Sequence, residues 1–405
     1  MTSRGRLTLL LGAGTYLAAW AFGAQVLYAP AVGLPLAVGA ALIWTNMLAR
    51  PLQLHRRVDR EQPTEGDDIV IRVELEADGG VLPATAVLHD PAGPLGDREL
   101  LVAREGRRLR AVNRLRRVPR GRYRLTGARV VVEDPFGLGR REQFLEASGA
   151  LLVYPRLARI NALFSERGLR SQGAGRMLLR RSAGYELHSV REYQSGESLR
   201  RVHWPTTARR SQLMVKELED SPRDEVSVVL DAQAGFGSGE PPDSSFDAQV
   251  RAAGSVLWAH ARRGRTAQLV VTSGRQPETL SVRSYERDWP RALETLAAAE
   301  QTGVRAVEAV LADEAGGPAH ARDLVVVTAA LRPSLVETLI DRSAARQHVS
   351  VVLVDAPSFA GVRPAVRAEG AVLRLQGLGI PVAVLRRRTD LLSALGAGGT
   401  DVAHA

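Results

Sequence analysis

The side chains most able to do chemistry gather in one charged stretch, residues 184–210. Arginines and glutamates lie close together there, and a guanidinium can bind a carboxylate through two parallel hydrogen bonds. His188 and His203 lie fifteen positions apart with no cysteine nearby, which does not match the ligand spacing of a zinc site. No Ser-His-Asp or paired-acid pattern appears. The stretch therefore favours a structural ion-pair network or a partner-binding surface over a catalytic site.

The composition excludes several other functions. The formal net charge is +10, yet all but one of the 54 basic residues are arginine, the exception being Lys216. The preference for arginine over lysine, together with abundant Ala and Gly, is explained more simply by a coding bias than by a phosphate-binding surface. We therefore expect no nucleic-acid partner. A P-loop is excluded because no glycine pattern precedes Lys216. The absence of cysteine excludes disulfides and a cysteine nucleophile.

The first 52 residues are typical of a membrane anchor. No charged residue occurs from 7 to 49, and Pro30 divides this segment into two spans, 7–29 and 31–49. Each span is long enough to cross about 30 Å of hydrocarbon as a helix. Arginines flank both outer ends, so the positive-inside rule predicts a multi-pass hairpin in the plasma membrane with the soluble domains in the cytoplasm. Membrane lipids would contact the chain through this hairpin.

Residues 60–155 alternate apolar and polar side chains with the period of half-buried strands. Turn signals separate short strands, which predicts a β-sandwich-like domain. Residues 104–124 contain ten arginines and one glutamate. Two interpretations stay open for these arginines, namely a solvated face or a contact with anionic lipid headgroups.

A different pattern follows a less regular linker, residues 156–222, which holds the charged stretch. Within residues 223–390, short β-branched runs alternate with helical stretches. This alternation predicts a doubly wound α/β domain, whose parallel sheet is covered by helices on both faces. Residues 391–405 are expected to form a flexible tail. The predicted fold is therefore multidomain, with a transmembrane hairpin, a β-sandwich-like domain and an α/β domain.

The charged stretch closely resembles the hallmark of the domain of unknown function 58 family. That hallmark runs Arg-Glu-Tyr, Gly-Asp/Glu, Arg, Trp and Ala-Arg. The matching positions here are Arg191, Glu192, Tyr193, Gly196, Glu197, Arg200, Trp204, Ala208 and Arg209. The resemblance extends upstream to Asp134-Pro-Phe-Gly-Leu and downstream to Leu213-Met-Val-Lys-Glu. With the membrane segment it covers most of the chain.

This resemblance implies a function through partners and not through catalysis. Family members resemble partners of MoxR-type AAA+ ATPases, so the chain is expected to be a non-enzymatic, membrane-anchored scaffold or adaptor for such an ATPase. The hallmark positions are the possible partner-binding surface, in which Trp204 is expected to be the buried packing anchor. A nucleic-acid-binding protein and an undetected hydrolase are the alternatives. Neither a client nor an oligomeric state follows from the resemblance.

The family's α/β domain looks like the von Willebrand factor A fold, whose metal-binding members carry Asp-x-Ser-x-Ser after the first strand. Alternate oxygen donors in a tight loop suit Mg²⁺. Here the sequence is Asp231-Ala-Gln-Ala-Gly, in which Gln233 is a weak donor and Gly235 has no side chain. We expect a degenerate site with no metal or other cofactor, in which Asp231 bonds loop amides. A hydrolase would instead require a polar, partly buried cluster around Asp231 or Glu192.

Overall fold

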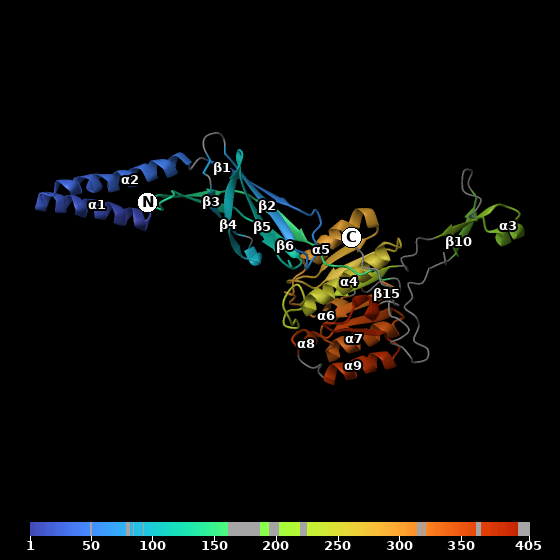
Figure 1. Cartoon of the computed structure of the whole chain (residues 1–405). Coiled ribbons are helices and arrows are strands. Elements are labelled where there is room, and N and C mark those ends of the chain that lie inside the picture. Colours follow the sequence, from blue (N-terminus) through green and yellow to red (C-terminus); the bar gives the residue numbers. More distant parts are fainter. Residues whose placement is uncertain are drawn as a thin grey trace. The chain divides into compact units, whose positions relative to one another are not determined.

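The structure, a computed structural model, describes residues 1–48, 51–77, 82–83, 85–91, 93–160, 187–193, 202–218, 225–313, 318, 321–361 and 366–395. The chain divides into two units, Met1–Tyr154 and Pro155–Ala405, and each is described by itself (Figure 1). The predicted order of an apolar N-terminal segment, an antiparallel β region and a later α/β region is confirmed.

The first unit begins with the helices α1 (Ser3–Phe22) and α2 (Tyr28–Leu48), which pack against each other and are joined by the 3₁₀ turn η1 (Gln25–Leu27). The sequence predicts a break at Pro30, but the chain turns at Gly23, which ends α1 with a left-handed φ of 63°. Glycine adopts this conformation without steric cost. Pro30 instead lies in the first turn of α2, where its missing N–H is not needed.

One segment near the N-terminus meets the requirements of a membrane helix. Among the described residues, Gln25–Leu48 alone is long and apolar enough to cross a membrane, with a mean hydropathy of 2.0. Helix α1 is less apolar, partly because Arg4 and Arg6 lie at its start. Length and composition therefore support one apolar membrane helix, and the second span of the hairpin stays a prediction.

Two antiparallel sheets form the rest of the first unit. The larger sheet has the order β1-β2-β5-β4-β3-β7-β8, and the smaller pairs β6 with β9. Alternating buried side chains from both sheets, such as Ile71 of β2 and Tyr123 of β6, share one hydrophobic core. The strands are β1 (Leu52–Val58), β2 (Ile69–Ala77), β3 (Thr85–Pro91), β4 (Asp97–Glu105), β5 (Arg108–Leu115), β6 (Gly121–Leu125), β7 (Ala128–Glu133), β8 (Arg140–Leu145) and β9 (Gly149–Val153), with a 3₁₀ turn η2 (Gly93–Leu95).

The arginine-rich residues 104–124 form most of β5 and β6. Antiparallel pairing places Arg110 opposite Glu74 and Arg108 opposite Glu76 on β2. Arg108 bonds Glu74 at 2.9 Å and Glu76 at 2.7 Å, and Arg110 bonds Glu74 at 3.1 Å. Glutamates that are distant in sequence thus balance part of this face, which favours the solvated face over the lipid contact for these arginines.

The second unit contains a small hairpin and a larger α/β region. The hairpin pairs β10 (Leu187–Glu192) with β11 (Met214–Leu218), and the short helix α3 (Trp204–Arg210) precedes β11. The strand order of the larger region is β14-β13-β12-β15-β16-β17, with all pairs parallel except β13 with β14. Its strands are β12 (Val226–Leu230), β13 (Ala267–Val271), β14 (Glu278–Val282), β15 (Asp323–Thr328), β16 (His348–Val354) and β17 (Val382–Leu385).

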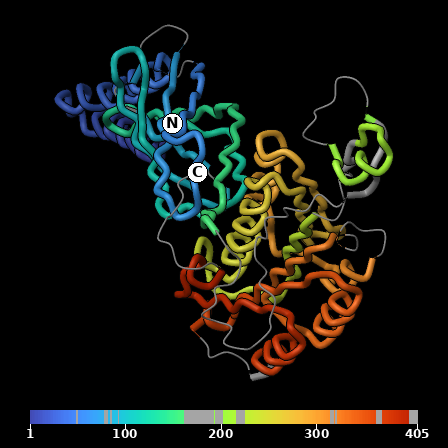
Figure 2. Tube along the Cα trace, turned by 90° about the vertical axis from the view of Figure 1, so that its right-hand side faces the viewer, coloured from blue at the N-terminus to red at the C-terminus, as the bar shows by residue number. Residues whose placement is uncertain are grey.

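Helices cover both faces of this sheet, shown in yellow to red in Figure 2. One buried cluster joins α4, α5, α8 and α10 to side chains such as Val228, and the other joins α6, α7 and α9 to side chains such as Val229. Successive residues of a strand point to opposite faces, which explains the unbroken apolar runs. The helices are α4 (Ser245–Ala261), α5 (Tyr285–Ala298), α6 (Val307–Ala312), α7 (Pro333–Ala344), α8 (Ala356–Phe359), α9 (Val366–Gly377) and α10 (Leu391–Leu395).

Candidate functional site

The sheet of the second unit changes its winding direction between β12 and β15. The chain passes from β12 to β13 on one side and later returns to β15 on the other side of β12. Doubly wound folds bind ligands outside the carboxyl ends of the strands at such a switch point. Asp231 directly follows β12 and Thr328 ends β15, so both residues lie at this position.

Asp231 is held in a buried set of hydrogen bonds. Its side chain is 3% exposed, Oδ2 accepts a bond from the Thr328 hydroxyl at 2.7 Å, and Oδ1 accepts a bond from the Gln233 N–H at 3.1 Å. Burial raises the pKa of Asp231 above its usual value, while these two bonds and the charge of Arg332 act in the opposite direction. The predicted bond from Asp231 to a loop amide is therefore present.

Neighbouring backbone fixes the loop that follows Asp231. The N–H of Ala232 donates to the Thr272 hydroxyl at 2.8 Å, and the Gly303 N–H donates to the Ala232 carbonyl at 2.8 Å. The Ala234 N–H donates in turn to the Gly303 carbonyl at 3.0 Å. A Cβ atom at Gly303 would collide with the carbonyl of Thr272, so this close approach requires glycine.

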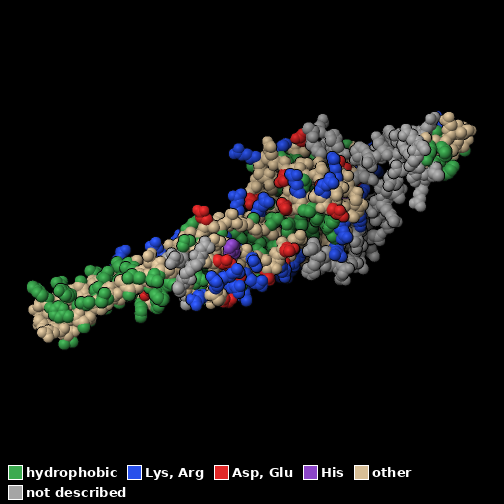
Figure 3. Space-filling model, turned by 90° about the horizontal axis from the view of Figure 1, so that it is seen from above, with side chains coloured by type: hydrophobic (Ala, Val, Ile, Leu, Met, Phe, Trp, Pro, Cys, Tyr) green, Lys and Arg blue, Asp and Glu red, His purple; other side chains and the backbone are tan. Residues whose placement is uncertain are grey.

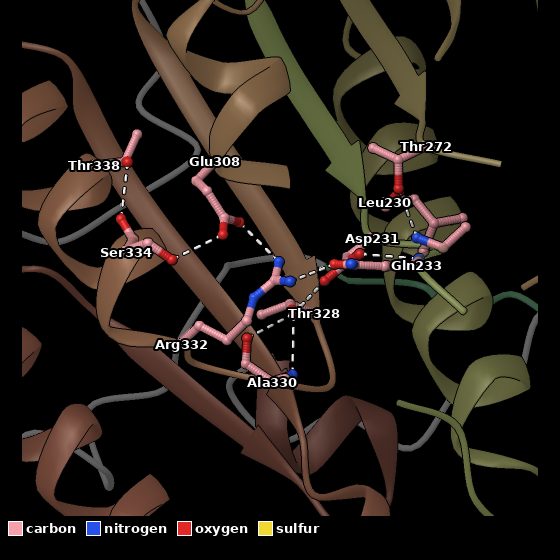
Figure 4. A network of polar contacts seen from close by, with 11 residues as sticks. Leu230, Asp231, Gln233, Thr272, Glu308, Thr328, Ala330, Arg332, Ser334 and Thr338 are labelled. Carbon is pink, nitrogen blue, oxygen red and sulfur yellow. Dashed lines mark hydrogen bonds and ion pairs between the residues drawn. The ribbon is translucent and has the colours of Figure 1, made fainter. Parts of the chain in front are cut away.

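Arg332 connects this loop to the helices on one face of the sheet (Figure 4). Its guanidinium donates to the side-chain oxygen of Gln233 and forms an ion pair of 2.7 Å with Glu308 of α6. Ser334, in the first turn of α7, donates its hydroxyl to the other oxygen of Glu308 at 2.8 Å. The guanidinium also lies 5.2 Å from the ring centroid of Phe236. Arg332 and Glu308 are partly exposed, at 23% and 19% of their side-chain surface.

The arrangement limits what this site can do chemically. Thr328 is fully buried and Asp231 nearly so, which keeps both away from a substrate in this conformation. The amide oxygen of Gln233, which would be the second oxygen donor of a metal loop, already accepts a bond from Arg332. In the described part of the chain, no group of three His, Cys, Asp or Glu side chains is placed to hold a metal ion. The exposed part of the site is thus a guanidinium beside a carboxylate and an aromatic ring.

The described hallmark residues lie in or beside the hairpin and in α3, and both elements precede Asp231 along the chain. Arg191 and Glu192 belong to β10, and the Tyr193 N–H donates to the Leu213 carbonyl at 2.8 Å. Trp204 starts α3 and is 65% exposed, so the expectation of a buried packing anchor is wrong. Helix α3 buries none of its seven residues, so it forms no core that could enclose the ring. Arg209 is exposed in the last turn of α3, whereas Gly196, Glu197 and Arg200 lie outside the described residues.

Sequence reasoning missed Thr328, Arg332 and Glu308 as parts of the site. Thr328 is a polar residue at the carboxyl end of a buried apolar strand, and a polar residue in that position indicates a candidate binding site. Arg332 directly precedes Pro333, the first residue of α7, so it marks a helix start near the same edge. Glu308 carries no such signal, because its contact depends on how α6 packs against α7.

The fold and site define a protein with an apolar N-terminal helix, an antiparallel β region and an α/β domain with a buried polar network. Residues 189–358 match the family described as "Protein of unknown function DUF58". The chain therefore carries a DUF58 domain, as its charged motif predicts.

The proteins similar to this chain include one from Bacillus subtilis and one from Clostridium difficile. An uncharacterized protein of Bacillus subtilis (strain 168), YeaD, is 29% identical over 223 residues. That alignment covers 55% of this chain and 54% of YeaD, so the chain spans about half the length of this relative. The solved structure of Cwp6 from Clostridium difficile covers 84% of this chain and 38% of Cwp6, with 9% identity and a TM-score of 0.21. A score this low supports no conclusion about fold or function.

Proposed function

We propose that this chain is a membrane-anchored, non-catalytic scaffold or adaptor that presents its α/β domain to a protein partner in the cytoplasm. The observation that carries the proposal is the network at the switch point. Asp231, Thr328 and Gln233 bond one another or Arg332, so the position where ligands of such sheets bind is filled by the protein's own side chains. The exposed rim of this network consists of Arg332, Glu308 and Phe236. Binding of a partner at this rim requires no catalytic group.

The chemistry of the rim suggests what it would recognise. Arg332 is an arginine beside an aromatic ring, and arginine and aromatic residues are enriched among the residues that dominate protein interfaces. A carboxylate on a partner could compete with Glu308 for the guanidinium. Resemblance of the family to partners of MoxR-type AAA+ ATPases makes such an ATPase the proposed partner, on analogy alone.

The domain is further proposed to be von Willebrand factor A-like and to have lost metal binding. In support, Asp231 follows the first strand of a doubly wound sheet, as the metal-binding aspartate of that fold does. The proposed anchoring combines Gln25–Leu48 with α1 as a second, weaker span. Arginines at both outer ends favour the cytoplasm for the soluble domains.

A pull-down of the full chain from detergent-solubilised membranes, followed by mass spectrometry, tests the adaptor role. We expect an AAA+ ATPase to be captured by the parent and by Arg291→Gln, an exposed arginine on α5. Arg332→Gln should capture at least several-fold less. Failure of the parent to capture any ATPase would reject this partner class, and equal capture by both variants would reject the Arg332 rim as its binding surface.

A hydrolase is the second candidate, because a polar, partly buried cluster does surround Asp231. A carboxyl with a raised pKa beside a hydroxyl is one arrangement that supports acid–base chemistry. Substrate would then have to open the site, since Thr328 is fully buried. Turnover of a generic ester or phosphate ester by the parent, abolished in Asp231→Asn, would favour the hydrolase over the adaptor.

A further inference from the structure

A cavity of about 340 Å³ lies where the helix pair meets the β strands of the first unit. Its lining residues come from the N-terminus, from α2 and from β8, namely Met1, Leu42, Ile43, Thr45, Asn46, Arg140 and Arg141. In Figure 3, hydrophobic side chains cover the free part of the helix pair, and Lys and Arg side chains gather toward the strands. The cavity therefore lies at the boundary between an apolar surface and a basic one.

Hydrogen bonds and close packing fix this junction. The Thr2 hydroxyl donates to the Gly137 carbonyl at 2.6 Å, and the Thr2 N–H donates to the Leu138 carbonyl at 3.1 Å. On the other helix, a Cβ added to Gly139 would come within 3.0 Å of both the Ala41 carbonyl and the Thr45 hydroxyl. The turn between β7 and β8 is thus held against both helices, so the cavity has fixed walls.

With the membrane anchoring proposed above, the cavity would lie at the membrane surface. The start of α1 and the end of α2 both lie at this junction, because Thr2 and Thr45 contact the same turn. Two aromatic side chains of the segments that meet at this junction are exposed, namely Trp44 of α2 at 52% and Phe136 of the turn between β7 and β8 at 78%. Such side chains are favoured at the level of lipid headgroups when an adjoining helix enters the hydrocarbon.

The charges inside the cavity favour an anion. Arg140 is already paired with Glu142 at 2.7 Å and with Glu133 at 3.6 Å. Arg141 is exposed and forms no ion pair with any residue that the structure describes. Asn46 of α2 also lines the cavity. A guanidinium and a side-chain amide can both donate hydrogen bonds to the oxygens of a phosphate.

We propose that this cavity binds the phosphate of an anionic phospholipid, with Arg141 as the main donor and with the acyl chains lying along the apolar surface of α2. The inference rests on the membrane anchoring proposed above and is independent of the ATPase partner. It places the lipid site at β8 and α2, and not on the arginine-rich strand β5, whose Arg108 and Arg110 are paired with glutamates.

Native mass spectrometry of the full chain in detergent, titrated with phosphatidylglycerol or phosphatidylcholine, tests this site. We expect tighter binding of phosphatidylglycerol by the parent and a loss of about tenfold in Arg141→Gln, as for one hydrogen bond to a charged group. Arg114→Gln, an exposed arginine on β5, should bind like the parent. Far-ultraviolet circular dichroism of both variants should match that of the parent, since both side chains are exposed.

The contrary outcomes point to different errors. Equal binding of the two lipids by the parent, or a loss in Arg114→Gln but not in Arg141→Gln, would overturn the proposed site. Complete displacement of phosphatidylglycerol by millimolar inorganic phosphate would make it a site for free phosphate and overturn the lipid assignment. Carbonate extraction of cell membranes tests the membrane anchoring separately. Release of the parent from the membranes would reject both the anchoring and the lipid site. Retention of the parent together with equal binding of the two lipids would reject the lipid site alone.

Discussion

The Thr328 hydroxyl donates a hydrogen bond of 2.7 Å to Oδ2 of Asp231, which joins the carboxyl ends of β15 and β12. Both side chains are buried. Burial raises the pKa of the Asp231 carboxyl, and the bond from Thr328 opposes that rise because it stabilises the charged form. The two residues thus hold a buried carboxyl at the switch point of the sheet. Ionisation of this carboxyl lowers the free energy of unfolding.

The first prediction concerns Asp231→Asn and the effect of pH on stability. A carboxyl with a raised pKa binds its proton more tightly in the folded state, so the contribution of Asp231 to the stability of the parent is largest below the ordinary carboxyl pKa. This contribution is lost as the pH rises through that value to the raised pKa of Asp231. Asn does not titrate. The stability of Asp231→Asn relative to the parent should therefore increase with pH across this window, by about 1.4 kcal/mol for each pH unit between the unfolded and folded pKa values.

Hydrogen exchange of the β12 and β15 amides in the full chain, measured from pH 4 to 7 and corrected for intrinsic exchange, reports this difference. Thr338→Val is a suitable control, because the hydroxyl of Thr338 is exposed and bonds only the Ser334 carbonyl of its own helix among the described residues. Parallel pH profiles for the parent and Asp231→Asn would show that the pKa of Asp231 is not raised.

The second prediction is that divalent metal does not stabilise the α/β domain. Arg332 bonds the amide oxygen of Gln233, so a guanidinium takes part of the position where a cation would need oxygen donors. Millimolar Mg²⁺ or excess chelator should leave the melting temperature of the parent unchanged. A rise of several degrees with Mg²⁺ would contradict this, because a ligand that binds only the folded state must stabilise it. A rise in the melting temperature of Arg332→Ala with Mg²⁺, without a rise for the parent, would show that the guanidinium prevents the cation from binding.

The sequence predicts the α/β domain well because its signals are local. Buried strands such as Val226–Leu230 are rich in β-branched residues, and α4 starts with a capping box in which Ser244 and Asp247 bond each other's backbone N–H groups. The β region is predicted less completely. Leu52–Val58 is missed as a strand, and Arg108–Leu115 is indicated only as part of an arginine-rich hairpin, because Arg56 and Asn113 occupy inward-facing positions there, where the pattern requires apolar residues.

Those inward-facing residues are explained only by the folded structure. Arg56 forms a buried ion pair of 2.6 Å with Asp90 of β3, which is 34 positions away in the sequence. The same limit applies to the switch-point site, since Arg332 meets Glu308 through the packing of two helices. Contacts between residues this far apart leave no period or spacing in a single sequence.

The third prediction concerns His260, which is 1% exposed in α4. Neither ring nitrogen has a hydrogen-bond partner in the described part of the chain. Burial, with the charges of Arg265 and Arg263, lowers the pKa of His260 to about 3. The folded state therefore holds His260 neutral, and stability is lost as the pH falls below the unfolded value of about 6.5. The loss at pH 5 should be about 2 kcal/mol.

His260→Leu removes this titration and fills a similar volume, so it should be at least as stable as the parent at pH 7. Its advantage should grow by about 2 kcal/mol between pH 7 and pH 5, since the parent alone has to protonate on unfolding. His55→Gln, at an exposed position on β1, should leave the pH profile of the α/β amides unchanged. An advantage that stays constant with pH would mean that the folded state does not lower the pKa of His260.

The last prediction is that Trp204→Ala weakens partner capture without weakening the fold. The ring is 65% exposed at the start of α3, so its removal should change stability by no more than about 0.5 kcal/mol, as for surface positions generally. An exposed tryptophan in a charged segment is a common source of binding energy, so capture of the proposed ATPase should fall at least several-fold. Arg210→Ala, exposed in the same helix but outside the family motif, should capture like the parent. A destabilisation of several kcal/mol would instead mean that the ring is buried in the working protein, and unchanged capture would exclude α3 from the interface.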